Sequence, residues 1–293
     1  MPTNPLTVAH KDALKLAEWI AWATGHYFGS TQHPRGEVLN VYRKARRDMS
    51  GALKAKRHTL RGEAREILAD TRAKLDTITT AAVRDAVQHG RTSALTQLAA
   101  YADDGVQYTP QMLPAIVEEL QRAPMAEFDR QALQILGMIA GGGDVRTAIV
   151  GDAGRVGIFS PAPVVNVGAD SVTKSVAASF AETVGREPAQ EFGWMKQPIP
   201  AIDDKTTETC LNVAGQVVKV DAKFHLTGEP RFADDMDWSP FHYFCRTSVA
   251  LYLPQYDDGI TAKLRDDVKA ERVRREAEDA EKEARKAARE AKK

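Results

Sequence analysis

Two cysteines and one histidine are the residues of this sequence whose types and spacing could do chemistry: Cys210, His242 and Cys245. Two thiolates and an imidazole are three of the four ligands of a tetrahedral zinc site. The His-x-x-Cys spacing is short enough for both side chains to reach one ion, and Asp203, Asp204 or a water would be the fourth ligand. Cys210 has no second cysteine three residues away, so the common Cys-x-x-Cys half of such sites is missing. These residues indicate a candidate zinc site.

Other interpretations of the same residues stay open. Cys210 and Cys245 are the only cysteines of the chain, and they could form a disulfide or be two buried thiols. Either cysteine could also pair with His242 as an activated nucleophile. An orienting acid and an oxyanion hole are not visible at the spacing of known families of such enzymes, so we predict no catalytic residues.

The composition indicates a mostly helical protein. The chain has 293 residues, with 40 Lys and Arg against 40 Asp and Glu, and only 7% are aromatic. This length suggests one or two domains at about 150 residues each. No apolar run reaches the ~18 residues that a membrane-spanning helix needs, and zero net charge excludes a protein that binds nucleic acid over its whole surface. Two cysteines cannot form a disulfide framework, which favours assembly in a reducing compartment.

The first half of the sequence has the periodicity of helices. Apolar residues recur every three or four positions, which predicts an amphipathic helix wherever the pattern continues. We expect helices over 8–27, over 37–90 as one long helix or a kinked pair, and over 92–103, 110–122 and 126–140. Three glycines at 141–143 cannot lie comfortably within an element, so they mark the expected border of a helical region spanning 1–143.

The rest of the sequence predicts a small α+β domain and a charged tail. Over 144–256 we expect strands at 156–159, 164–167 and 217–220, and a helix at 171–184 that Asp170 or Ser171 would cap. Over 257–293 the sequence predicts a charged helix that needs a partner on which to dock, because its apolar residues are mainly alanines at a spacing of three and four. A solvated or disordered extension is the alternative for this segment. The fold class is therefore α+β, with a mostly helical N-terminal half.

A basic segment lies within the predicted helical region. Between Arg35 and Lys74 there are 12 Lys and Arg against five Asp and Glu. Such a segment is either a surface for phosphate groups or an acidic partner, or simply the solvated face of a helix. The residues of this candidate nucleic-acid or partner patch are Arg43, Lys44, Arg46, Arg47, Lys54, Lys56, Arg57 and Arg61.

The residues between 194 and 246 follow a recognisable order. A tryptophan is followed by Asp-x-Lys-Thr, by a cysteine seven residues after the aspartate, by a glycine five residues further on and finally by Pro-x-His-x-x-Cys-Arg. This order resembles that of the phage Mu F-like minor head proteins, also called phage head morphogenesis proteins. The resemblance covers residues 145–255, and Ser239 and Thr247 stand where members of that family often carry a proline and a cysteine. The matching residues are Trp194, Asp203, Lys205, Thr206, Cys210, Gly215, Pro240, His242, Cys245 and Arg246.

The resemblance implies a minor head protein of a tailed phage or prophage, bound at or near the portal during head morphogenesis. The implied partners are the portal protein, scaffold or major capsid protein, with packaged DNA as a further contact, and no membrane. The implied location is the virion, in the head interior or near the portal, after assembly in the cytoplasm of the host bacterium. In this interpretation the protein is not an enzyme, and its motif residues are structural.

The alternative is a zinc-dependent enzyme that processes nucleic acid. It would hold the metal at Cys210, His242 and Cys245 and would use Asp203 or Asp204 to activate a water. A second acid–histidine pair close to the site would distinguish the enzyme, and the sequence does not display one.

Overall fold

The chain folds into two compact units, each built from separate segments of the sequence. The computed structural model describes residues 4–29, 36–54, 60–101, 114–151, 157–185, 193–227, 235–242 and 244–290. We call Trp19–Thr92 with Thr109–Thr183 the helical unit, and Met1–Glu18, Ser93–Tyr108 and Val184–Lys293 the sheet unit. The borders expected at 143 and 256 do not coincide with the borders of these units.

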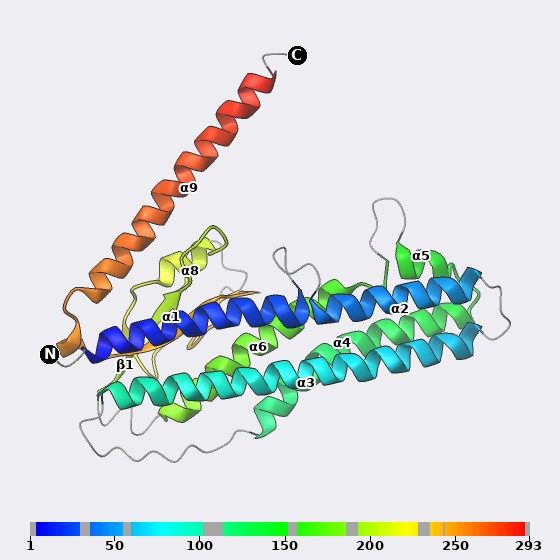
Figure 1. The fold of residues 1–293 in the computed structure, drawn as a ribbon, viewed down its shortest axis with the longest axis horizontal. Coiled ribbons are helices and arrows are strands. Elements are labelled where there is room, and N and C mark those ends of the chain that lie inside the picture. Colours follow the sequence, from blue (N-terminus) through cyan, green and yellow to red (C-terminus); the bar gives the residue numbers. More distant parts are fainter. Residues whose placement is uncertain are drawn as a thin grey trace. The chain divides into compact units, whose positions relative to one another are not determined.

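Helices with apolar residues at helical spacing build the helical unit, where α2, α3 and α4 lie side by side (Figure 1). Its centre is aromatic: the ring centroids of Tyr42 and Phe159 are 4.7 Å apart, and Phe128 packs edge-on against both. Arg46 donates to the carbonyl oxygen of Phe159, so its guanidinium stabilises the fold internally. The helices of the first part of the chain are α1 (Pro5–Ala23), a π-helix (Thr24–Phe28), α2 (Glu37–Lys54), α3 (Leu60–Tyr101), α4 (Pro114–Ala140), α5 (Val145–Val150) and α6 (Pro161–Val184). Most of α1, up to Glu18, and the end of α3, from Ser93, belong to the sheet unit.

Several expected helices are present with different ends. The segment 37–90 forms two helices, α2 and α3, and residues 55–59 between them lie outside the described part. The helix expected at 92–103 is the end of α3, and those expected at 110–122 and 126–140 are the single helix α4, which contains Pro124. The three glycines at 141–143 form a turn inside the helical unit.

The expected strand at 164–167 is wrong, because these residues belong to α6. Pro161 suits the first turn of a helix, where a missing N–H costs nothing. The side chains of α6 are buried on nearly every side, so its valines lack the polar face that distinguishes a helix from a buried strand. Asp170 and Ser171 are therefore inside the helix and cap nothing. At the other expected strand, 156–159, Val156 lies outside the described residues and 157–159 are not extended.

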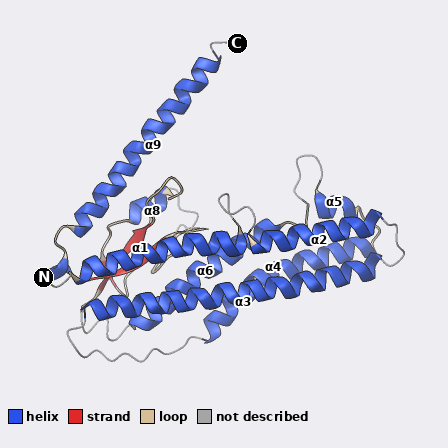
Figure 2. Cartoon of the chain, in the orientation of Figure 1, coloured by secondary structure: helices blue, strands red, loops and turns tan. Residues whose placement is uncertain are grey.

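The sheet unit contains a three-stranded antiparallel sheet (Figure 2). The strand expected at 217–220 is confirmed as β2, whereas β1 and β3 were not expected. The mostly helical α+β class is also confirmed. The strands are β1 (Met195–Pro200), β2 (Val218–Lys219) and β3 (Thr247–Tyr252), in the order β2-β1-β3, with Gln197 opposite Ala250.

Two side chains of α3 cover the outer edge of β3, and the backbone of α1 binds a side chain of the same strand. The side-chain carbonyl of Gln97 accepts a hydrogen bond from the N–H of Leu251 at 2.8 Å, and the hydroxyl of Tyr101 donates to the carbonyl of Leu251 at 2.8 Å. Ser248 in turn donates to the carbonyl of Ala13 in α1. An exposed edge would offer unpaired backbone groups to other chains, so these contacts close that side of the sheet.

The helix α9 (Ile260–Glu290) confirms the expected helical tail and divides into two halves. In its first half Leu264, Val268 and Glu271 are buried in the sheet unit. From Glu276 to Glu290 every described side chain is exposed. None of the described helices has the length and hydropathy to cross a membrane.

Two glycines of the helical unit give a matched test of its packing. A side chain at Gly90 of α3 would overlap the carbonyl oxygen of Val176 and the hydroxyl of Ser179 in α6, whereas one at Gly51 of α2 would meet nothing. We expect Gly90→Ala to lower the free energy of unfolding by about 2 kcal/mol through overpacking. Gly51→Ala should raise it by up to ~1 kcal/mol. Urea denaturation measures both, and equal effects would contradict the close packing of α3 on α6.

Candidate metal centre

A short helix and a tight turn position the three candidate ligands. Cys210 lies in α8 (Glu208–Val213), whose first turn is capped by Thr207, because the Thr207 hydroxyl accepts from the N–H of Cys210. His242 and Cys245 belong to the turn before β3, in which the N–H of Cys245 donates to the carbonyl of His242 at 3.2 Å. Phe244 in this turn has a φ of 57°, a backbone conformation that residues other than glycine rarely adopt. The turn brings His242 back over Cys245.

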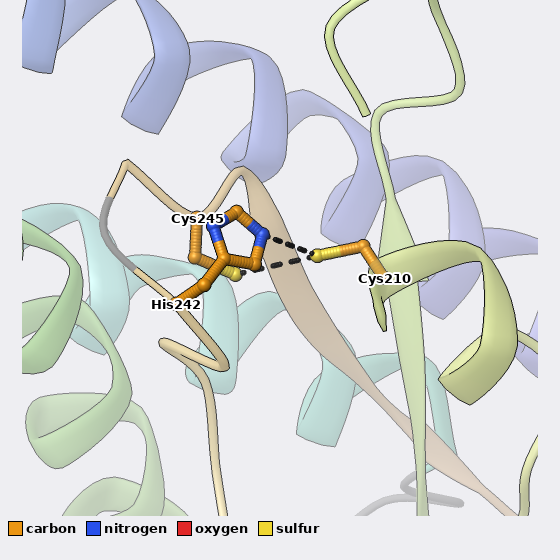
Figure 3. Close-up of side chains that lie close together, drawn as sticks. All are labelled: Cys210, His242 and Cys245. Carbon is orange, nitrogen blue, oxygen red and sulfur yellow. Dashed lines mark hydrogen bonds between the residues drawn. The ribbon is translucent and has the colours of Figure 1, made fainter. Parts of the chain in front are cut away.

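The structure brings Cys210, His242 and Cys245 together (Figure 3). Their donor atoms all lie within 4.8 Å of one another. The sulfur of Cys210 is 2.9 Å from Nε2 of His242 and 3.7 Å from the sulfur of Cys245. A disulfide has a sulfur–sulfur distance of about 2.05 Å, so no disulfide joins the two cysteines in this structure. These three donors could hold a metal ion, as the sequence indicates.

The centre lies in an apolar core. The exposed fraction is 2% for Cys210, 0% for Cys245 and 9% for His242. Phe224 and Phe241 pack edge-to-face beside them, with ring centroids 5.8 Å apart. Thiols in such surroundings are shielded from bulk water, as expected for a site that stabilises a fold.

The two thiols have pKa values displaced in opposite directions. A hydrogen bond with Cys245, together with burial, raises the pKa of Cys210 well above its usual value. Burial alone would raise the pKa of Cys245 too, but hydrogen bonds from Cys210 and His242 outweigh it and hold that pKa well below the usual value. The arrangement therefore stabilises the thiolate form of Cys245 and disfavours the thiolate form of Cys210. A divalent cation would supply the charge that a second thiolate needs.

Asp203 is not part of this group. Arg246 donates to both of its carboxylate oxygens, at 2.6 Å for one of them. Asp203 also accepts from the N–H of Lys205 at 2.9 Å and from the hydroxyl of Thr206 at 3.2 Å. Burial would raise the pKa of Asp203, but the Arg246 guanidinium and these donors lower it. Asp203 thus caps its turn, and neither it nor the exposed Asp204 belongs to the metal-binding group in the described part of the chain.

Arginines of α9 fasten the segment that carries Cys210. Arg265 donates to the carbonyl of Gly215 at 3.0 Å. Gly215 has a φ of 78° and lies in the turn that follows α8. Arg272 pairs with Glu208 at 2.6 Å, and Arg275 donates to the carbonyls of Asp203 and Thr206. These arginines were not predicted from the sequence. The sequence did contain a signal for them: Arg265, Arg272 and Arg275 are seven and three positions apart, a spacing that places them on one side of a helix, beside the buried face of α9.

The remaining motif residues have structural positions. Trp194 is buried, with its ring centroid 6.3 Å from that of Tyr101, and Lys205 is exposed in the turn that Asp203 caps. Pro240 follows a cis peptide bond and is buried. Lys196, which was not predicted, is fully buried with its ammonium 4.5 Å from the ring centroid of Trp238.

The basic patch belongs to the helical unit and is partly engaged within it. Lys44 pairs with Asp48 at 2.6 Å, and Arg43 donates to Asn40. Arg46, as described above, is bound to a backbone carbonyl. Arg47, Lys54 and Arg61 are exposed, and Lys56 and Arg57 lie outside the described residues.

Glu271 makes the arginine contacts of α9 dependent on pH. Hydrogen bonds from Arg274 and Arg275 lower the pKa of Glu271 to about 2. An unfolded glutamate has a pKa of about 4.3, so these contacts stabilise the fold above that pH, and the stabilisation is lost as the pH falls toward 2. We expect Glu271→Gln to lower the free energy of unfolding at pH 7 by about 2 kcal/mol. The difference from the wild type should shrink toward zero near pH 2.

Urea denaturation between pH 2 and pH 7 measures this difference. Glu276→Gln, at an exposed position on the same helix, is the matched control and should behave as the wild type. A difference that stayed constant over the whole range would contradict the assignment.

Comparisons with models of protein families, with curated proteins and with solved structures gave no match for this chain. The contacts of its own residues are therefore the basis for assigning a function.

Proposed function

We propose that this chain is a minor head protein of a tailed phage or prophage, of the Mu F-like type, which acts in head morphogenesis at or near the portal. One observation supports the proposal above others. Cys210, His242 and Cys245, which are distant in sequence and belong to the family-like order, meet in one core, and Asp203 and Arg246 of the same order form an ion pair beside it. Such an arrangement is expected when the residues of a motif stabilise the fold of their domain.

We propose further that the centre binds one zinc ion in a structural role. Two sulfurs and one imidazole nitrogen are a donor set that suits zinc. The burial of these donors also favours a structural site over a reactive one. The alternative enzyme has less support, because Arg246 already engages Asp203, the carboxylate that would activate water.

The second half of α9 is the surface that we propose for the head partner. A helix that is polar and exposed on all sides gains little stability by itself and commonly bridges to another protein. This half presents a row of small residues bordered by acids, which suits a partner surface with positive charges around a shallow apolar groove. The row consists of Ala277, Ala280, Ala284 and Ala287, and the bordering acids are Glu276, Glu281, Glu283 and Glu290. The portal protein, scaffold and major capsid protein are the proposed partners, with packaged DNA as a further contact.

Zinc content tests the metal proposal directly. We expect protein purified under reducing conditions to contain about one zinc per chain by elemental mass spectrometry. Cys210→Ser and Cys245→Ser should each remove most of it, while His225→Ala, which changes an exposed histidine of the same unit, should retain it. At zinc concentrations about a thousandfold above Kd, the metal should add about 4 kcal/mol to the free energy of unfolding. Background zinc in the reduced wild type would overturn the metal proposal.

Co-purification tests the head function. Tagged full-length protein, expressed with its neighbouring genes, should recover a portal or capsid protein at low stoichiometry, identified by mass spectrometry. Removal of residues 276–293 should abolish this recovery and change the free energy of unfolding by less than about 0.5 kcal/mol, because the described side chains removed are exposed.

Two results of this experiment would count against the proposal. Recovery of neither a portal nor a capsid protein with the full chain would reject the head function. Unchanged recovery with the shortened chain would reject α9 as the docking surface. Zinc content of the shortened chain serves as the control for an intact sheet unit.

A further inference from the structure

Thr247, the first residue of β3, has a buried hydroxyl without a well-aligned hydrogen-bond partner among the described residues. Its side chain is 0% exposed, and its oxygen lies close to the sulfur of Cys210 without forming an aligned hydrogen bond to it. A buried polar group without a partner destabilises a fold. A bound water or ion is one explanation for such an atom, and its surroundings decide whether that explanation applies.

Two observations place this hydroxyl beside the metal centre. Side chains alternate between the two faces of an extended chain, and the ladder continues before β3, since Ala201 donates to the carbonyl of Arg246 at 3.1 Å. Thr247 therefore shares a face with Cys245, two residues earlier, whereas Arg246 points the other way, to Asp203. Val249, two residues further along the same face of β3, packs in one apolar cluster with Cys210 and Cys245.

The three donors leave one position of a tetrahedral site without a ligand from the described residues. A zinc ion with three protein ligands takes a water as the fourth, an arrangement that serves catalysis where a nearby base activates the water. Among the described residues no base joins the three donors, so the water would only complete the coordination, oriented by a second group of the protein. No carboxylate of the described chain joins the group, because Asp203 is engaged by Arg246.

We propose that Thr247 forms the fourth side of the metal centre, where its hydroxyl holds the water that completes the coordination of the ion. Thr247 is then a positioning residue, and the bound water gives its buried hydroxyl a partner. This inference rests on the proposed zinc site. It goes further by stating where the open position lies and that an oxygen ligand fills it.

Cobalt(II), bound to the full-length protein in place of zinc under a phosphine reductant, is the probe. Absorption from thiolate-to-cobalt charge transfer grows with the number of bound thiolates. Thr247→Cys should put a third thiolate in the place of the water and raise this absorption by about one half, from two thiolates to three. Thr247→Val keeps the shape and removes the hydroxyl, so zinc affinity should fall about tenfold. Thr247→Ser should restore the affinity to within about twofold of the wild type.

Thr79 of α3 provides the matched control. It is the other threonine of the described chain whose buried hydroxyl has no hydrogen bond, and it lies in the helical unit. Thr79→Cys also adds one cysteine, and Thr79→Val also removes one hydroxyl. Neither should change the cobalt spectrum or the zinc affinity.

The possible results separate this inference from the zinc proposal. A wild type that binds neither cobalt nor zinc overturns both. A wild type that binds the metal overturns only the role of Thr247 if Thr247→Cys adds no charge-transfer absorption, or if Thr247→Val binds zinc as tightly as the wild type.

Discussion

The ion pair between Asp203 and Arg246 connects the two parts of the chain that build the metal centre. Arg246 stands between Cys245 and Thr247, and Asp203 begins the turn that leads to Cys210. Because the guanidinium donates to both carboxylate oxygens, the contact fixes the orientation of both segments as well as their distance. The three donors meet only if the turn before α8 and the start of β3 keep these positions.

The first half of α9 strengthens the same arrangement from a third direction. Its arginines bind backbone carbonyls at Asp203, Thr206 and Gly215, which are groups that no other described side chain of the motif satisfies. Bonds from a charged donor are stronger than neutral ones. The helix therefore changes character near Arg275: the residues before it hold α8, and the described side chains beyond it are exposed.

Local patterns predicted the helices well and the sheet poorly. Helical periodicity is a property of neighbouring residues, so α2, α3 and α9 could be found in the sequence. The strand β1 contains Pro198 and Pro200, which weaken any strand prediction, and α6 resembled a strand because it is buried on nearly all sides.

The candidate centre was predictable in part for a similar reason. The order and spacing of Cys210, His242 and Cys245 were enough to indicate a metal site. The contribution of Arg275 could not be predicted, since it lies 72 positions from Asp203, and only the fold brings the two together. The role proposed for Thr247 could not be predicted from the sequence, because the surroundings of a buried hydroxyl are known only from the fold.

The covered edge of β3 has a consequence for how the protein is made. Gln97, Tyr101 and Ala13, whose groups bind that edge, all precede the strands in the chain. A ribosome therefore completes α1 and α3 before β3 emerges, and the strand can find its covering helices as soon as it is synthesised. The nascent sheet need not expose this free edge to other copies of the chain.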